Sequence, residues 1–214
     1  MKHVLIVDDH AMVRKGLVGI LTMQQVGDQS LVCNEAGGGE EALQLLERQE
    51  YDLVILDISM PGLGGLELLS RIHETWPSLP VLMLSMFPEE QFALRSLKLG
   101  ASGYLTKKEA ADELLLAVAQ LFSGKRYLSQ SLSNILINQA LDGDTGSRPS
   151  HSSLSNREFQ ILRSLATGKS LKAVAYDLEL SIKTVSTYKA RLFAKMGFHS
   201  DADLITYANN HNLT

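Results

Sequence analysis

Five side chains suited to phosphoryl transfer lie scattered along the first half of the 214-residue sequence. They are two adjacent acids, a third acid, a hydroxyl and an amine: Asp8, Asp9, Asp57, Ser85 and Lys107. Three carboxylates brought together repel and raise one another's pKa, and a divalent cation with oxygen ligands, such as Mg²⁺, removes that conflict. Phosphoryl transfer needs mainly positioning and charge neutralisation. The set therefore predicts that Asp57 accepts a phosphoryl group beside Mg²⁺ and Lys107.

These residues lie where short apolar runs end. Runs of strand length occupy residues 3–7, 52–56, 81–84 and 103–105, with a fainter one at 31–35, and amphipathic stretches with apolar residues three and four apart separate them. Alternating strands and helices predict an α/β fold of about five βα units with a parallel sheet. If the strand order is the flavodoxin-like 2-1-3-4-5, the five side chains meet at the carboxyl edge of the sheet, where such folds bind ligands.

Taken singly, these residues have simpler explanations. An acidic pair after a strand is most often a solvated turn or a helix cap, and a lone lysine there usually has no role. Their coincidence at four strand ends of one sheet is what favours the phosphorylation site.

Composition and charge distribution divide the chain into two parts. The 45% hydrophobic and 21% charged fractions are typical of a soluble globular protein. The longest apolar run, residues 114–119, is too short to cross a membrane, and the acids at positions 8 and 9 argue against a signal peptide. The single cysteine, Cys33, excludes an internal disulfide. Residues 1–128 hold 11 Lys+Arg and 17 Asp+Glu, whereas residues 151–214 hold 8 and 5. We expect a cytoplasmic protein with an acidic first part and a mildly basic second part.

The second part is predicted to be a small all-α, four-helix domain. The stretch 142–153, DGDTGSRPSHSS, has no apolar residue and reads as a linker, with an amphipathic helix at 132–140 before it. After it, Ser155 and Glu158 form a capping-box pattern, and helices are expected at about 155–167, 171–178, 182–196 and 201–210. The short break at 179–181 predicts a helix-turn-helix.

The expected third helix has the side chains of a DNA-contacting helix. It carries four cations, no acid, and a row of hydroxyl groups: Lys183, Lys189, Arg191, Lys195, Thr184, Ser186, Thr187 and Tyr188. Cations and small donors suit phosphates and base edges in a major groove. A basic helix alone is more often a solvated face, but its place as the second helix of the motif favours double-stranded DNA.

The first part resembles the receiver domains of two-component response regulators. The resemblance rests on VLIVDDH (4–10), DLVILDISMPGLGG (52–65), VLMLS (81–85) and GASGYLTKK (100–108), and covers residues 1 to about 122. It implies that Asp57 is the phospho-acceptor and Lys107 the phosphoryl-binding cation. It also implies that Asp9 and Asp57 bind Mg²⁺ with the Ser59 backbone carbonyl, that Asp8 acts through that site, and that Ser85 and Tyr104 form a switch pair.

The second part resembles the LuxR-type helix-turn-helix of NarL/FixJ response regulators. The matching stretches are LSNREFQIL (154–162), ATGKSLKAVAYDL (166–178) and LSIKTVSTYKARLFAKMG (180–197), with the motif at about 170–189. The resemblance implies base reading at Ser186, Thr187 and Ala190. It implies backbone or groove-edge contacts for the flanking residues Lys183, Thr184, Tyr188, Lys189 and Arg191. Tyr188 replaces a usual His, and Leu171 a usual Asn.

Together these patterns predict a receiver domain at 1–122, a linker helix and flexible linker at 123–153, and a DNA-binding domain at 154–214. The expected function is a transcription regulator, phosphorylated by a sensor histidine kinase or phosphotransfer protein and acting as a homodimer, with RNA polymerase as a further partner. In the resting state, the receiver is expected to cover the recognition helix. Two alternatives stay open. One is an Mg²⁺-dependent aspartyl-phosphate phosphatase, although Ser59 stands where its second acid belongs. The other is a constitutive DNA-binding protein with a silent receiver.

Overall fold

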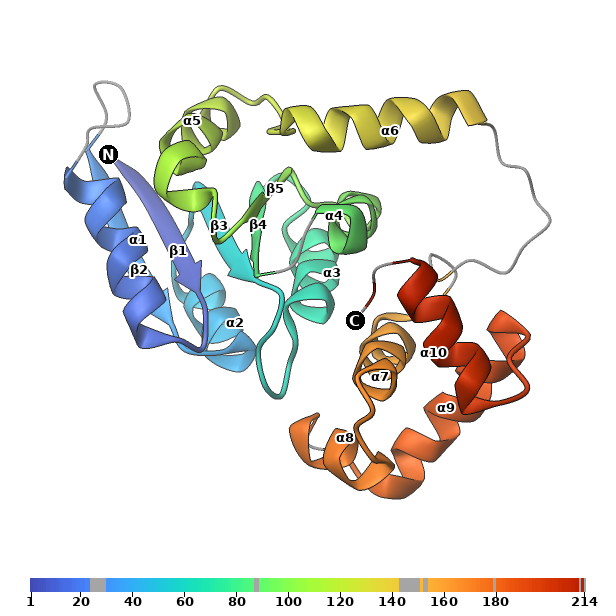
Figure 1. The fold of residues 1–214 in the computed structure, drawn as a ribbon. Helices are drawn as coiled ribbons and strands as arrows, with labels where there is room; N and C mark the ends of the chain where they lie inside the picture. Colours follow the sequence, from blue (N-terminus) through green and yellow to red (C-terminus); the bar gives the residue numbers. More distant parts are fainter. Residues whose placement is uncertain are drawn as a thin grey trace. The chain divides into compact units, whose positions relative to one another are not determined.

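The chain folds into two compact units, Met1–Gly143 and Asp144–Thr214 (Figure 1). The computed structural model describes residues 1–23, 30–86, 89–142, 151, 154–178, 180–211 and 213. Of the expected linker at 142–153, only residues 142 and 151 belong to this described part. None of the described helices is long and apolar enough to cross a membrane.

The first unit is built around a five-stranded parallel sheet in the order β2-β1-β3-β4-β5. This confirms the predicted flavodoxin-like order. The strands are β1 (Lys2–Val7), β2 (Leu31–Ala36), β3 (Leu53–Asp57), β4 (Val81–Ser85) and β5 (Gly103–Thr106). Every residue of β3 and β4 is buried, as expected for central strands covered on both faces.

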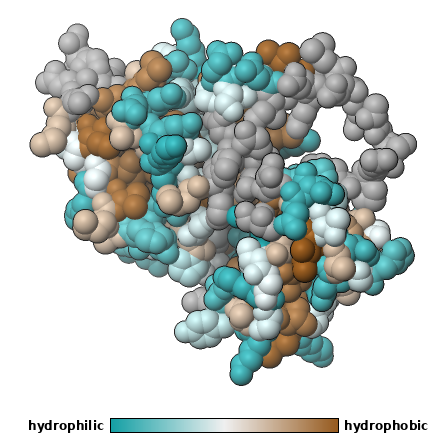
Figure 2. All heavy atoms as spheres, in the orientation of Figure 1, coloured by the Kyte–Doolittle hydropathy of each residue, from teal (hydrophilic) through white to brown (hydrophobic). Residues whose placement is uncertain are grey.

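Five helices alternate with the strands. They are α1 (Ala11–Met23), α2 (Gly39–Arg48), α3 (Gly65–Thr75), α4 (Glu89–Lys98) and α5 (Ala110–Phe122). Helices α1 and α5 lie on one face of the sheet, α2 and α3 on the other, and α4 lies beside β5 (Figure 1). On the face shown in Figure 2, hydrophobic surface gathers over α1, whose Met12 and Met23 side chains are exposed.

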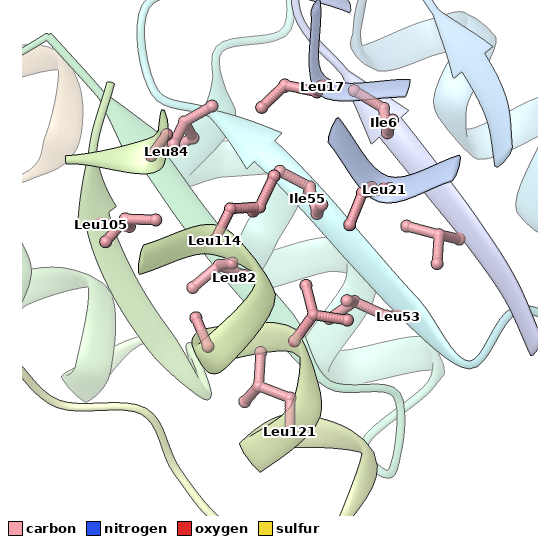
Figure 3. Close-up of a cluster of buried hydrophobic side chains, with 14 of the residues drawn as sticks. Ile6, Leu17, Leu21, Leu53, Ile55, Leu82, Leu84, Leu105, Leu114 and Leu121 are labelled. Atoms are coloured by element: carbon pink, nitrogen blue, oxygen red, sulfur yellow. The ribbon is translucent and has the colours of Figure 1, made fainter. Parts of the chain in front are cut away.

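A layer of aliphatic side chains holds α1 and α5 against the sheet. Leu17 and Leu21 of α1 and Leu114 of α5 point toward strand residues such as Ile55 and Leu82 (Figure 3). Each buried side chain of this kind contributes about 1.5–3 kcal/mol. The layer therefore fixes the strands, and with them the positions of their carboxyl ends.

The strand register aligns those ends. Val7 pairs with both Ala36 and Leu56, so Asp8 begins just beyond the sheet beside the end of β3. Asp57 pairs with Leu84, and Ser85 is opposite Thr106. The residues that follow β1, β3, β4 and β5 therefore share one edge.

The chain after α5 stays within the first unit. Tyr127 forms a parallel bridge with Gly103, and its N–H donates to the Ser102 carbonyl at 3.0 Å. The buried Tyr127 side chain donates its hydroxyl to Glu113 of α5. Helix α6 (Gln130–Asp142) confirms the helix expected near 132–140, and it packs against α4 with Leu132 fully buried. The first unit thus extends past α5 through α6.

The second unit is helical: α7 (Asn156–Ala166), α8 (Leu171–Asp177), α9 (Ile182–Met196) and α10 (Asp201–Asn210). Each helix begins after a serine whose side chain accepts a backbone N–H, namely Ser155, Ser170, Ser181 and Ser200. Such caps contribute about 1 kcal/mol each. The predicted capping box of Ser155 and Glu158 is present. A core around Ile161, Val174 and Val185 joins α7, α8 and α9.

Candidate acidic site and nucleic-acid interface

Four of the five chemically interesting residues meet at the carboxyl edge of the sheet through their side chains. Lys107 Nζ lies 2.7 Å from Asp8 Oδ2 and 3.0 Å from Asp57 Oδ2. Asp8 and Asp57 are only 1% and 2% exposed. Asp9 belongs to the same acidic pocket, since one ligand atom from each of Asp8, Asp9, His10 and Asp57 lies within 4.8 Å of the others.

The fifth residue, Ser85, is joined to the site by the backbone. Its side chain is fully buried at the end of β4, and its carbonyl accepts the Lys107 N–H at 2.7 Å. This hydrogen bond extends the β4–β5 ladder by one residue and thereby sets where the Lys107 side chain starts.

A close approach of α3 to β3 shapes the loop after Asp57. The Gly65 N–H donates to the Ile58 carbonyl at 3.2 Å, and a Cβ on Gly65 would lie 1.9 Å from the Asp57 carbonyl oxygen. Only glycine permits that approach. Gly62 in the preceding turn has a φ of +65°, in the left-handed region that favours glycine. The glycines of the DISMPGLGG stretch thus allow the first residue of α3 to pack against the backbone of Asp57.

Burial and charge oppose each other at Asp57. Burial raises the pKa of Asp57, and the nearby Asp8 adds to this, while Lys107 lowers it; the net result is a raised pKa. Burial lowers the pKa of Lys107, but its bonds to Asp8 and Asp57 outweigh burial and leave it raised. Asp57 Oδ1 is buried and has no hydrogen-bond partner of good geometry among the described residues. The pocket thus holds more carboxylate charge than Lys107 alone neutralises.

Two basic residues next to the acids were not anticipated from the sequence. His10 Nδ1 lies 2.8 Å from Asp9 Oδ1 and 3.2 Å from Asp8 Oδ1, and the His10 N–H donates to Asp8 Oδ1 at 2.8 Å. Arg14 of α1 donates from Nη1 to the Asp8 carbonyl at 2.6 Å. Both lie within six residues of Asp8, so their proximity along the chain was the available signal.

The remaining expected residues of this site lie close by. Ser59 is exposed two residues after Asp57, and its backbone N–H slightly opposes the rise in the pKa of Asp57. Metal binding by the Ser59 carbonyl stays a prediction. Tyr104 on β5 is fully buried and pairs with Met83 of β4. The Tyr104 ring therefore lies in the interior of the first unit.

The residues expected to contact DNA do not share one environment on α9. The exposed ones are Lys183, Ser186, Thr187, Ala190 and Arg191. Thr184 is half-buried, with its hydroxyl 2.7 Å from Ser181 Oγ. Tyr188 packs against the helical core, and Lys189 is ion-paired with Asp201 of α10 at 2.5 Å. Arg191 lies over the Tyr188 ring, with its guanidinium carbon 6.0 Å from the ring centroid. The uncharged reading positions thus face solvent, while four of the five flanking residues have partners within the unit.

Comparison with known proteins gives two family matches. Residues 4–119 match the response regulator receiver domain, and residues 152–208 match the bacterial regulatory proteins of the luxR family. The chain is 33% identical over 213 residues to the response regulator UvrY of Escherichia coli (strain K12), with 100% of this chain and 96% of UvrY covered. It is 34% identical over 217 residues to the response regulator GacA of Pseudomonas aeruginosa, covering 100% and 98%.

A similar solved structure is that of RcsB from Salmonella enterica serovar Typhimurium. That protein is bound to the promoter P1flhDC in the presence of the phosphomimetic BeF3−. The TM-score is 0.67 at 28% identity, with 98% of each chain covered.

Proposed function

Because the chain belongs to the NarL/FixJ family of response regulators, with a receiver and a LuxR-type DNA-binding domain, we propose that phosphorylation of Asp57 controls its binding to DNA. The observation that carries the proposal is the Asp57 carboxylate. It is buried, it faces Lys107 at 3.0 Å, and its Oδ1 has no good hydrogen-bond partner among the described residues. A sensor histidine kinase or phosphotransfer protein would supply the phosphoryl group.

The acidic pocket fits a hard divalent cation. Asp8, Asp9 and Asp57 offer several carboxylate oxygens within a small volume, one of them orphaned, and oxygen ligands are what Mg²⁺ prefers. These residues would hold Mg²⁺ together with the Ser59 carbonyl, and the ion would supply charge neutralisation for the transferred phosphoryl group. Lys107 provides a second positive charge at the same carboxylate.

The switch would link Asp57 to the β4–β5 edge. A phosphoryl group adds negative charge and acceptor oxygens, which draw the Ser85 hydroxyl toward Asp57. The space that Ser85 leaves would accommodate the Tyr104 ring, which is fully buried on β5 beside β4. Activation is then a population shift between two packings of the β4–β5 region.

The output would be sequence-specific binding of double-stranded DNA by a homodimer. Ser186, Thr187 and Ala190 would read base edges from the exposed face of α9, with Lys183 and Arg191 on phosphates. Because its target is DNA, we place the protein in the cytoplasm, with RNA polymerase as a further partner. The receiver would catalyse only its own phosphorylation and dephosphorylation.

The test is phosphorylation by acetyl phosphate with Mg²⁺, followed by intact mass and by gel shift on genomic fragments. Wild type should gain the mass of one phosphoryl group and shift at lower protein concentration. Asp57→Asn should do neither. Asp52→Asn is a matched control, since this acid lies at the opposite end of β3 in an ion pair with Lys2, and it should behave as wild type. Phosphorylation of Asp57→Asn, or a gel shift that ignores the donor, would refute the proposal.

A further inference from the structure

One cation of the DNA-contacting helix is held by an acid of the next helix. Lys189 Nζ lies 2.5 Å from Asp201 Oδ1 and 5.1 Å from the centroid of the Phe193 ring. The Lys189 side chain is only 23% exposed, whereas Asp201 is 64% exposed. The aromatic ring and the carboxylate together confine the ammonium beside the start of α10.

A second cation of α9 is also occupied. Lys195 is paired with the buried Glu158 at 2.7 Å. Lys183 and Arg191 are exposed and have no acidic partner within 4.0 Å in the part of the chain that the structure describes. Of the four cations that the sequence assigns to this helix, two are therefore available to phosphates without breaking an ion pair.

We propose that Asp201 is a specificity-determining residue that neutralises Lys189 and lowers the affinity of the protein for DNA of any sequence. The inference rests on the proposed function. Sequence-independent affinity comes from cations that release counterions on contacting phosphates. A lysine already paired with a carboxylate adds little to this, and the carboxylate itself repels the phosphates.

The consequence concerns the ratio of specific to non-specific binding. The reading positions Ser186, Thr187 and Ala190 are uncharged, so their contacts with bases lack the added strength of charge-assisted hydrogen bonds. If contacts with phosphates supplied most of the binding free energy, the protein would bind throughout the genome, where non-specific sites are in vast excess. With Lys189 neutralised, occupancy depends more on base contacts and on pairing of two protomers.

The ion pair has little structural purpose. Asp201, the partner to be replaced, is 64% exposed, and ion pairs with an exposed partner contribute little to folding. The start of α10 is already capped by Ser200 and Asp203, which form a reciprocal capping box. Replacing Asp201 with asparagine should therefore leave the fold of the unit intact, which circular dichroism and a second variant, Asp201→Ser, would verify.

The experiment measures binding of the full-length protein to a random-sequence DNA duplex by fluorescence anisotropy over a salt series. Asp201→Asn should bind about fivefold to tenfold tighter at ~0.1 M salt, with a salt slope steeper by roughly 0.9 per protomer. In the Lys189→Met background, the same substitution should tighten binding much less, because it then removes only the repulsion between the carboxylate and the phosphates. Asp112→Asn removes one exposed charge from the first unit and should match wild type.

Three results would overturn the inference. Asp201→Asn could bind no tighter, or it could bind more weakly, which would mean that Asp201 orients Lys189 toward DNA. It could also tighten binding equally in the Lys189→Met background. If wild type itself binds no DNA even when phosphorylated, the proposed function fails as well. If wild type binds and Asp201→Asn is unchanged, only the role of Asp201 is refuted.

Discussion

Replacing Lys107 with methionine would leave two buried carboxylates side by side without their cation. Lys107 Nζ is 2.7 Å from Asp8 Oδ2 and 3.0 Å from Asp57 Oδ2, and the lysine side chain is itself only 9% exposed. Methionine keeps most of the apolar volume of the lysine stem. The substitution therefore removes the charge and little else.

The expected loss of stability follows from these distances. At an effective dielectric constant of about 20, each contact represents roughly 5–6 kcal/mol of attraction. The measurable loss is smaller, because water enters and a carboxylate can take a proton. Removing one partner of a buried ion pair typically costs about 3–5 kcal/mol. At about 2–4 °C per kcal/mol for a unit of this size, the melting temperature should fall by on the order of 10 °C.

The loss should depend on pH and on Mg²⁺. The pKa of Asp57 is already raised by burial, and Lys107 opposes that rise. Without the lysine, the pKa of Asp57 rises further. When the pKa of a carboxyl is raised in the folded state, the free energy of unfolding of the protein falls as pH increases through that pKa. The variant should therefore be less destabilised under mildly acidic conditions than at neutral pH. Mg²⁺ should restore part of the stability, because it binds the folded pocket.

Urea unfolding in the presence of EDTA is the direct assay. Trp76, the only tryptophan of the sequence, follows α3 and reports on the first unit alone. Lys108→Met removes the neighbouring exposed lysine and should be near-neutral. If Lys107→Met costs no more than about 1 kcal/mol at neutral pH, which is the range of a surface pair, the electrostatic account of the pocket is wrong.

Two further substitutions, one in each unit, test contacts described above. Gly65→Ala should lower the free energy of unfolding by about 1–3 kcal/mol through overpacking and slow phosphorylation by acetyl phosphate, because the added Cβ would meet the Asp57 carbonyl. Gly16→Ala is the control, since a Cβ at this position would have nothing within 4 Å, and it should stabilise the protein. Equal phosphorylation rates for the two variants would contradict this reasoning. Burial raises the pKa of Glu158, but its bonds to Lys195 and Ser155 outweigh burial and leave it lowered. The stability it contributes is present above about pH 4.3 and lost as pH falls through the folded-state pKa. Glu158→Gln should therefore reduce the acid sensitivity of native α9 amide resonances in an NMR titration, and an unchanged titration would argue against the ion pair.

The fold was predictable because buried parallel strands leave a clear signal. Residues 53–56 are apolar without interruption, and strands of this kind need helices on both faces. Once the strand order is given, the ends of β1, β3, β4 and β5 must share an edge. The convergence of Asp8, Asp57 and Lys107 follows from that geometry and needs no knowledge of side-chain conformations.

Side-chain partners across elements were harder to anticipate. Lys189 and Asp201 lie on separate helices, and their pairing depends on the angle at which α10 packs, which the core of the unit decides. The packing of α6 against α4 could not be predicted either. The sequence of α6 is mostly polar and indicates only that the helix has an apolar side. The receiver boundary expected near residue 122 followed from the extent of the resemblance and stays a prediction, whereas the first compact unit runs to Gly143.

The bridge between Tyr127 and Gly103 has a practical consequence for dissecting the molecule. β5 is the last strand of the sheet, and Tyr127 covers part of its outer side. A fragment cut after Phe122 would leave that strand with open N–H and C=O groups and would uncover the apolar contacts of Leu132. Exposed strand edges pair with other chains, so such a fragment should self-associate through an edge that Tyr127 partly covers in the intact protein. Fragments that run through Asp142 would avoid this artefact.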